Sequence, residues 1–135
     1  MKSVQILLFL SFIYTQTTID GQPKSLSLEM KNPITQIVMP NFDIDQLLIE
    51  DQNYRSGKPF RYGNIFEVEY NLNNSGTWEI LDDGSKLWRL EIKSEGAYAI
   101  GIEYDYFHLP VNSEFYVYSS NKENIYGAYS HHNNQ

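Results

Sequence analysis

The side chains that could carry out acid–base chemistry are three glutamates in strand-like stretches. Hydrolysis of a glycosidic bond needs two carboxylates on either side of a sugar ring, and Glu67, Glu69 and Glu91 are the candidates for such a pair. Each alternates with apolar neighbours, so each falls on the solvated face of its predicted strand. We therefore interpret them as surface residues and predict no catalytic residue in this chain.

Two other groups of side chains have the chemistry of metal ligands. Asp82 and Asp83 offer the oxygen ligands that calcium prefers, but they precede a glycine without the acid spacing of a calcium loop, which favours an ordinary turn. His131 and His132 are adjacent, and on an extended chain their imidazoles point in opposite directions, which is poor geometry for chelation. No serine or acid lies at a sequence spacing from His108 that would indicate a catalytic group. We predict no metal site and no cofactor.

Two tryptophans are better suited to binding than to catalysis, because exposed indoles stack on sugar rings. Trp88 alternates in step with Leu90 and Ile92, which favours a place in the core. Arg89, Glu91 and Lys93 are then predicted to lie on the opposite, solvated face. Trp78 lies in a shorter run, for which a core position and an exposed position both stay open. Trp78 is therefore the candidate contact for a glycan or a protein partner.

Composition narrows the classes of function. The 135 residues include no cysteine, which excludes a thiol nucleophile and thiolate zinc or iron–sulfur sites. The motifs of serine hydrolases, zinc peptidases and phosphate-binding loops are also absent from the sequence. A formal net charge of -7 with no basic patch repels nucleic acid and anionic lipid, so we expect neither as a partner.

The first residues have the pattern of an export signal. A basic start at Met1-Lys2 precedes an apolar run from Val4 to Tyr14, which is too short to span a bilayer and fits the apolar region of a signal peptide. We predict a signal peptide over residues 1–21 and a secreted, cell-surface or periplasmic protein. The alternative is that the run is a buried strand or helix at the start of the domain.

Two cleavage points for this leader stay open. Gly21, with Ile19 two positions earlier, is one, and Thr17, with Thr15, is the other, because small or short residues are preferred at such sites. Residues 22–32 are polar, and we expect them to form a flexible leader in the mature chain.

Alternation of apolar and polar residues dominates the rest of the chain. We predict strands where this alternation occurs between turn signals such as Asp-Asp-Gly. Residues 56–59 are predicted to form a turn. The predicted strands are 34–39, 65–72, 77–81, 86–93, 97–104, 115–118 and 125–129. Short strands at this spacing, wet on one face, favour an all-β antiparallel sandwich of jelly-roll type.

One domain, residues 33–130, holds these strands, and residues 131–135 are predicted to be a polar tail. Residues 43–51 differ in character, because their apolar residues are spaced loosely like one face of a helix. Asn41 or Asp43 is placed to cap such a helix. A short helix and an irregular loop both remain possible interpretations there.

Several stretches of the chain also match one series of family motifs, which reads roughly Gly-x-x-x-Trp-Arg-Leu-x-Ile, Ser-x-Gly-Ala, Leu-Pro-x-Gly-Ala-x-Leu-x-Ile-Tyr and Gly-x-Phe/Tyr-Thr/Ser. The matching stretches are Thr77-Trp78, Asp82 to Ala97, Leu109 to Tyr118 and Ile125 to Tyr129, with Ile44 to Asp51 and Lys58 to Gly63 upstream. Over residues 33–133 the chain resembles the N-terminal non-catalytic β-rich region of secreted lysyl-endopeptidase-like (trypsin-like serine) peptidases of Gram-negative bacteria. One departure is Val111-Asn112-Ser113, where the family usually has an acid and a glycine.

The resemblance implies a function that is not catalytic. In that family the peptidase domain follows this region and carries the serine, histidine and acid, so none of those residues has a counterpart here. The chain is then expected to be an accessory domain or pro-domain, cut off before the peptidase domain of its precursor, that acts by docking, folding assistance or inhibition. The alternative is a free-standing extracellular module for carbohydrate binding or adhesion.

Overall fold

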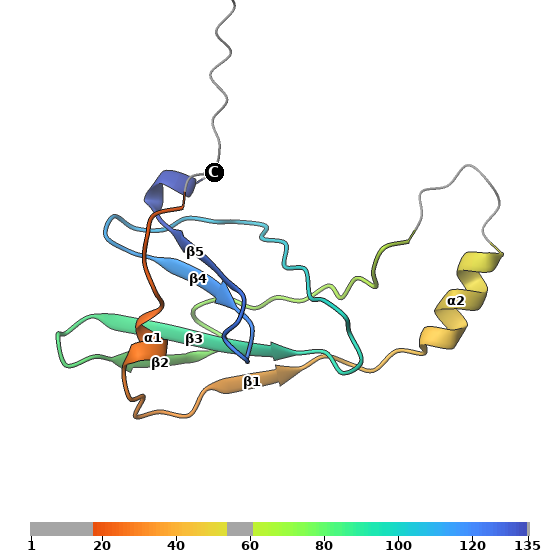
Figure 1. The fold of residues 1–135 in the computed structure, drawn as a ribbon, viewed down its shortest axis with the longest axis horizontal. Helices are drawn as coiled ribbons and strands as arrows, with labels where there is room; N and C mark the ends of the chain where they lie inside the picture. The colour runs from red at the N-terminus through yellow and green to blue at the C-terminus, as the bar shows by residue number, and fades with distance from the viewer. Residues whose placement is uncertain (1–17, 54–60, 135) are drawn as a thin grey trace, which may run out of the picture. The chain divides into compact units, whose positions relative to one another are not determined.

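The computed structural model of this chain describes residues 18–53 and 61–134. The first part of the predicted signal peptide, residues 1–17, and the turn predicted at 56–59 lie outside these ranges. The chain divides into two compact units, whose α-helices and strands are labelled in Figure 1. We call Leu28–Ile102 the central unit, and the residues before and after it, up to Ser27 and from Glu103, the terminal unit. Within the described ranges, no helix has the length and apolar character needed to cross a membrane.

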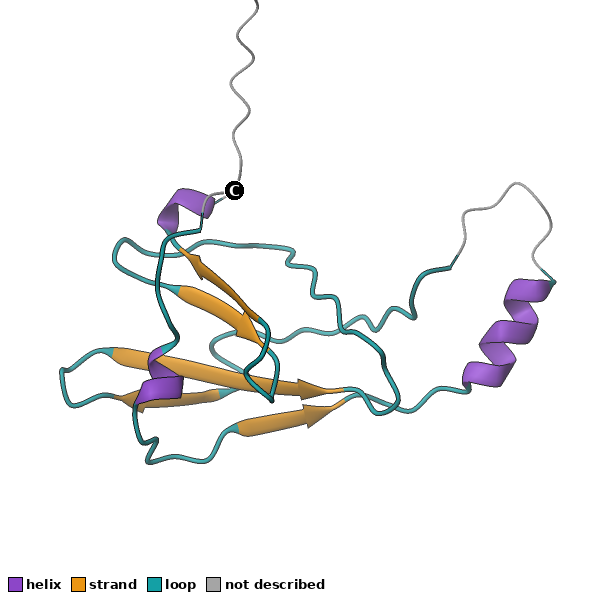
Figure 2. Cartoon of the chain, viewed as in Figure 1, coloured by secondary structure: helices purple, strands orange, loops and turns teal. Residues whose placement is uncertain are grey.

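The described residues confirm a β-rich class, with strands that outnumber short helices (Figure 2). The central unit contains a mixed sheet in the order β1-β3-β2, formed by β1 (Thr35–Val38), β3 (Lys86–Lys93) and β2 (Thr77–Ile80). β2 and β3 pair antiparallel across the predicted Asp-Asp-Gly turn, where Gly84 has a φ of 80°. Such a φ is easily reached only by glycine, which explains the residue at this reversal.

The pairing of β1 corrects the prediction of a purely antiparallel sheet. β1 runs parallel to β3, with Thr35 opposite Leu90 and Val38 opposite Lys93. Parallel neighbours need a long connection between them. The residues between Met39 and Gly76, which include a helix, supply it. The alternation within each strand does not encode this direction, because the same side-chain faces result from either pairing.

The helix in that connection is α2, Ile44–Gln52, so the helical interpretation of this segment is confirmed. Its N-cap is Asp43, one of the two predicted caps, whose carboxylate accepts a hydrogen bond from the backbone N–H of Gln46 at 3.0 Å. At the other end, the guanidinium of Arg61 lies 3.0 Å from a carboxylate oxygen of Glu50 and 3.1 Å from one of Asp51. These local contacts require little from the rest of the fold.

Two segments that were predicted as strands, 65–72 and 97–104, belong to no strand in the part of the chain that the structure describes. Their apolar side chains are largely exposed, as shown by Ile65 at 80% and Val68 at 46%. An alternating pattern specifies two faces of a strand, but a strand also needs a neighbour for its backbone N–H and C=O groups. The prediction of these strands was therefore wrong for the isolated chain.

The terminal unit contains the antiparallel pair β4 (Phe115–Tyr118) and β5 (Ile125–Tyr129), with an irregular register between Phe115 and Val117. Rings packed at centroid distances of 5.6 to 6.3 Å form its aromatic cluster. The members are Tyr104, Phe107, Phe115 and Tyr129. Burial in this cluster raises the pKa of Tyr104.

Short helices lie on both sides of the predicted domain. Residues 22–32, expected to be a flexible leader, include α1 (Lys24–Ser27), the buried Pro23 and several hydrogen bonds to distant residues. The polar tail includes the 3-10 helix η1 (His131–Asn133). There the Ser130 side chain accepts from the backbone of His132, and the Asn133 side chain accepts from the N–H of Ser130. A capping arrangement of this kind orders a short turn of helix.

Tyr116, on β4, provides a test of the terminal unit at high pH. Burial, reinforced by a hydrogen bond to Glu114, raises its pKa from 10 to about 12. The folded state therefore holds this proton more tightly than the unfolded chain, so the stabilisation is present below pH 10 and is lost as the pH rises from 10 to 12. We expect urea midpoints to fall more steeply over this interval for the native chain than for Tyr116→Phe. Equal slopes for the two proteins would show that Tyr116 titrates normally.

Candidate functional site

The most distinctive part of the central unit is the pair of tryptophans on the β2–β3 hairpin. Trp78 and Trp88 lie directly opposite each other in the antiparallel register, and opposite residues share one face of the sheet. Trp78 is 47% exposed on the edge strand β2, whereas Trp88 is half-buried on the middle strand. The exposed part of the Trp78 side chain is available for contact with a partner.

Both indoles are held in place by one loop, residues 71–76. The indole N–H of Trp78 donates to the carbonyl of Leu72 at 2.9 Å, and that of Trp88 donates to the carbonyl of Ser75 at 2.8 Å. The loop is shaped by its own side chains, because the Asn71 carboxamide accepts from the N–H groups of the following residues. These bonds fix the ring orientations before any ligand arrives.

A hollow of about 450 Å³ lies beside Trp78 and is lined by Trp78, Glu79, Ile80 and Lys86. This volume is within the usual range for small-molecule sites. Ile80 and the indole supply exposed apolar surface, and the Lys86 ammonium supplies hydrogen-bond donors. Chemically, the hollow can stack a flat or ring-shaped ligand and donate to its oxygens. It contains no arrangement of an acid with a base from which we can derive a reaction.

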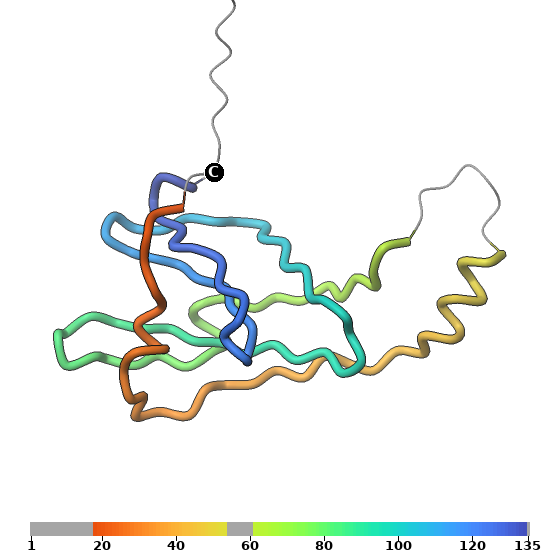
Figure 3. Tube along the Cα trace, in the orientation of Figure 1, coloured from red at the N-terminus to blue at the C-terminus, as the bar shows by residue number. Residues whose placement is uncertain are grey.

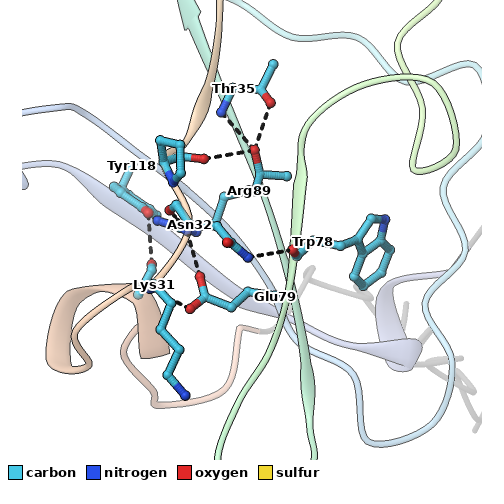
Figure 4. A network of polar contacts seen from close by, with 10 residues as sticks. Lys31, Asn32, Thr35, Trp78, Glu79, Arg89 and Tyr118 are labelled. Atoms are coloured by element: carbon cyan, nitrogen blue, oxygen red, sulfur yellow. Dashed lines mark hydrogen bonds and ion pairs between the residues drawn. The ribbon is translucent and has the colours of Figure 1, made fainter.

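Glu79, which lines this hollow, also belongs to a buried polar network (Figure 4). The Glu79 side chain is 3% exposed and the Arg89 side chain 12%, and their charged atoms lie 2.9 Å apart. The other Glu79 oxygen accepts the backbone N–H of Lys31 at 2.6 Å, and Arg89 also donates to the carbonyl of Asn32 at 2.8 Å. The network therefore ties the segment before β1 to the hairpin.

Threonines extend the same network along β1. The Thr77 hydroxyl accepts the backbone N–H of Thr35 at 3.0 Å and donates to the carbonyl of Pro33 at 3.1 Å (Figure 4). Both Glu79 oxygens and one terminal nitrogen of the Arg89 guanidinium are bonded to protein, so we assign the pair a structural role. The Arg89 Nε is buried with no hydrogen-bond partner among the described residues.

The sequence prediction missed this ion pair and placed Arg89 on a solvated face. Residues 87 to 92 of β3 are half-buried on both faces, so the expected contrast between a wet face and an apolar face is not observed. One signal could have revealed the pair. Once the Asp-Asp-Gly turn sets the register, Thr77 lies opposite Arg89 and Glu79 opposite Leu87, which places Glu79 and Arg89 on one face as diagonal neighbours.

The carboxylates considered for catalysis or calcium binding do not gather into a site. Glu67 and Glu69 are exposed in the segment without a strand partner, and Glu91 is half-buried on β3. Asp82 forms an exposed ion pair with Lys31 at 2.8 Å, which raises the pKa of the Lys31 ammonium. Asp83 accepts the backbone N–H of Ser85 at 2.9 Å, which is the contact of a turn residue.

The histidines are arranged differently from the prediction. Because η1 is helical rather than extended, the rings of His131 and His132 do not point apart, and their centroids are 3.9 Å from each other. His108 stacks on Tyr106 with a centroid distance of 6.1 Å. Among the residues that the structure describes, no three His, Asp or Glu side chains are grouped so that they could hold a metal ion.

No protein-family model matches the chain, and no solved structure matches it at a significant level.

Proposed function

We propose that this chain is a non-catalytic accessory module, or pro-domain, of an exported serine peptidase, and that it acts by binding the peptidase domain of the same precursor. The observation that carries the proposal is the exposed apolar surface on residues 65–72 and 98–102, which we call the docking segments. Large exposed apolar surfaces on a protein mark sites of interaction. The resemblance to the region that precedes lysyl-endopeptidase-like domains supports the choice of partner.

The chemistry of the docking segments fits pairing with a strand of the partner. Their apolar side chains recur at every second position, for example at Val68 and Tyr70, and again at Ile100 and Ile102, and all four are exposed. A partner strand supplies backbone hydrogen bonds, and its alternate side chains fill the spaces between these residues. Exposed Glu67 and Glu69 lie between the apolar positions, so the partner surface is expected to be apolar with a basic margin.

Pairing of the docking segments with a partner strand also accounts for the sandwich fold that we infer for the complete domain. With the docking segments paired, the short strands of the chain would supply the layers of a β-sandwich of jelly-roll type, in which β1 keeps its parallel pairing with β3. A stable contact of this kind buries at least about 1,200 Å² in total. The predicted signal peptide places the module and its peptidase outside the cytoplasm, at the cell surface or in the periplasm.

Binding to the peptidase domain encoded with this chain is the direct test. We expect Val68→Asp to weaken binding at least about tenfold, which is ~1.4 kcal/mol, because a charge replaces an apolar contact. Val111→Asp is the matched control, since Val111 is 67% exposed but lies outside the docking segments. Calorimetry on both variants, with circular dichroism to check folding, separates the outcomes. Equal weakening by both, or by neither, would contradict the docking surface.

The gene itself tests the choice of partner. A reading frame that continues past the Gln135 codon into a trypsin-like peptidase domain, or a neighbouring gene for one, is the expected finding. Absence of both would remove the peptidase from the proposal.

A second candidate function, carbohydrate binding, is favoured by the exposed indole of Trp78 beside the hollow. The ring is oriented by its bond to the Leu72 carbonyl, and a preoriented aromatic platform suits the stacking of a sugar. A glycan array with the native chain would yield hits that disappear in Trp78→Ala and persist in Trp78→Phe. An array without hits, or hits that Trp78→Ala retains, would exclude this function for the hollow.

A further inference from the structure

The segment from Thr18 to Ser27, drawn in red to orange in Figure 3, is bonded into the terminal unit rather than leading up to it. The N–H of Ile19 donates to the carbonyl of Ala128, and the N–H of Ala128 donates to the carbonyl of Ile19, both at 3.2 Å. A reciprocal pair of this kind is the unit of an antiparallel ladder. Ala128 is buried, so residue 19 supplies the partner for both polar backbone groups of a buried residue on β5.

Further contacts continue this attachment. The hydroxyls of Ser25 and Tyr118 are 2.8 Å apart, which links α1 to β4. Pro23, between Ile19 and α1, is buried, and its carbonyl accepts the N–H of Leu26 at 2.9 Å. We call residues 18–27 the strap, because they lie along β5 and then contact β4.

The strap changes the meaning of Gly21. In the sequence, Gly21 was a small residue suited to precede a cleavage point. In the structure, a Cβ at this position would meet the Tyr116 hydroxyl and lie 3.7 Å from the Cβ of Ala128. A close approach of a side chain to the backbone is a sufficient reason for glycine here. Packing is therefore a reason for glycine at position 21 that does not depend on processing.

We infer that the leader is removed after Thr17, so that the mature chain starts at Thr18 and keeps the strap. This inference rests on the proposed export. Of the two cleavage points that the sequence leaves open, the one after Gly21 would remove Ile19 and leave the buried N–H and carbonyl of Ala128 without their partners. The cut after Thr17 leaves that pair intact and places the new charged terminus on Thr18, which is exposed.

The cleavage point is tested on the full chain exported by a Gram-negative host. Intact mass and N-terminal sequencing are expected to identify Thr18 as the first residue, and Gln22 as the first residue would overturn the inference while leaving the proposed export in place. Thr17→Leu should block processing, because a bulky residue is unsuited to the cleavage site, whereas Gly21→Leu should still be processed. The opposite pattern would also overturn the inference.

A second measurement tests the role of the strap independently of export. If the chain is not exported, that finding counts against the proposed function and not against the strap. Chains that begin at Thr18 and at Gln22, made without a leader, are compared by urea unfolding. We expect the shorter chain to lose about 1 M in its midpoint, because two buried backbone bonds are missing. Equal midpoints would refute the strap.

A matched pair of variants in the longer chain isolates the backbone contact. Ile19→Pro removes the N–H that Ala128 accepts and should lower the urea midpoint, whereas Ile19→Ala keeps both backbone bonds and should change it little. If Ile19→Ala is as harmful as Ile19→Pro, the Ile19 side chain rather than the ladder holds the segment, and the argument from backbone pairing fails.

Discussion

Replacement of Arg89 by methionine is expected to lower the free energy of unfolding by about 3–5 kcal/mol. The guanidinium pairs with Glu79 at 2.9 Å, and both side chains are almost inaccessible to solvent. Methionine has a similar volume but cannot pair, so the Glu79 carboxylate would be left buried with the Lys31 N–H as its remaining partner among the described residues. The loss approaches the whole stability of a small domain. Urea unfolding followed by circular dichroism measures it.

Two controls separate the buried pair from charge in general. Replacement of both Glu79 and Arg89 by methionine should recover most of the loss, because burial of two apolar side chains leaves no uncompensated charge. Asp82→Asn breaks only the exposed pair with Lys31, and should cost less than about 1 kcal/mol. If Arg89→Met costs no more than Asp82→Asn, the network in Figure 4 does not hold the segment before β1.

Gly76→Ala is expected to destabilise the protein by about 2–4 kcal/mol, for two reasons that add. Gly76 has a φ of 81°, which is strained for alanine. A Cβ there would also fall against the Trp88 indole, with the Cζ2 atom at 2.7 Å, so the ring must shift and its bond to the Ser75 carbonyl must weaken. Urea unfolding and the tryptophan emission maximum report the two consequences together.

Gly84→Ala is the matched control for this prediction. Gly84 has nearly the same φ, 80°, but an added Cβ would meet nothing within 4 Å. Its cost is therefore the backbone strain alone, roughly 1–2 kcal/mol, with unchanged emission. The difference between the two variants measures the close approach of the loop to Trp88. Identical losses would mean that the indole moves aside freely and that the loop does not fix its orientation.

Where the determining contacts are local, the sequence was a sufficient guide. The Asp-Asp-Gly turn and its flanking alternation predicted the β2–β3 hairpin, and Asp43 was one of two residues predicted to cap α2. Each of these features depends on residues within a few positions of one another. The turn geometry or the cap is then nearly the same whatever surrounds it.

The candidate site was predicted only in part, because Trp78 was identified but its surroundings were not. The loop that orients the indole is local, yet the ion pair behind it joins β2 to β3 and to the segment before β1. Alternation assigned Arg89 to the solvent, since a pattern within one strand does not reveal which segment covers its second face. The resemblance to a peptidase-associated region supplied the proposed partner, and it stays a prediction.

By itself, the sequence determined that this chain is rich in strands and where the β2–β3 hairpin turns, because short-range geometry and side-chain periodicity decide those features. Only the tertiary structure decided the parallel pairing of β1, the burial of Glu79 with Arg89, and the place of Ile19 beside Ala128. Each of these joins residues far apart in the chain. Many segments with the same alternation compete for each partner, and the choice among them depends on the whole set of contacts.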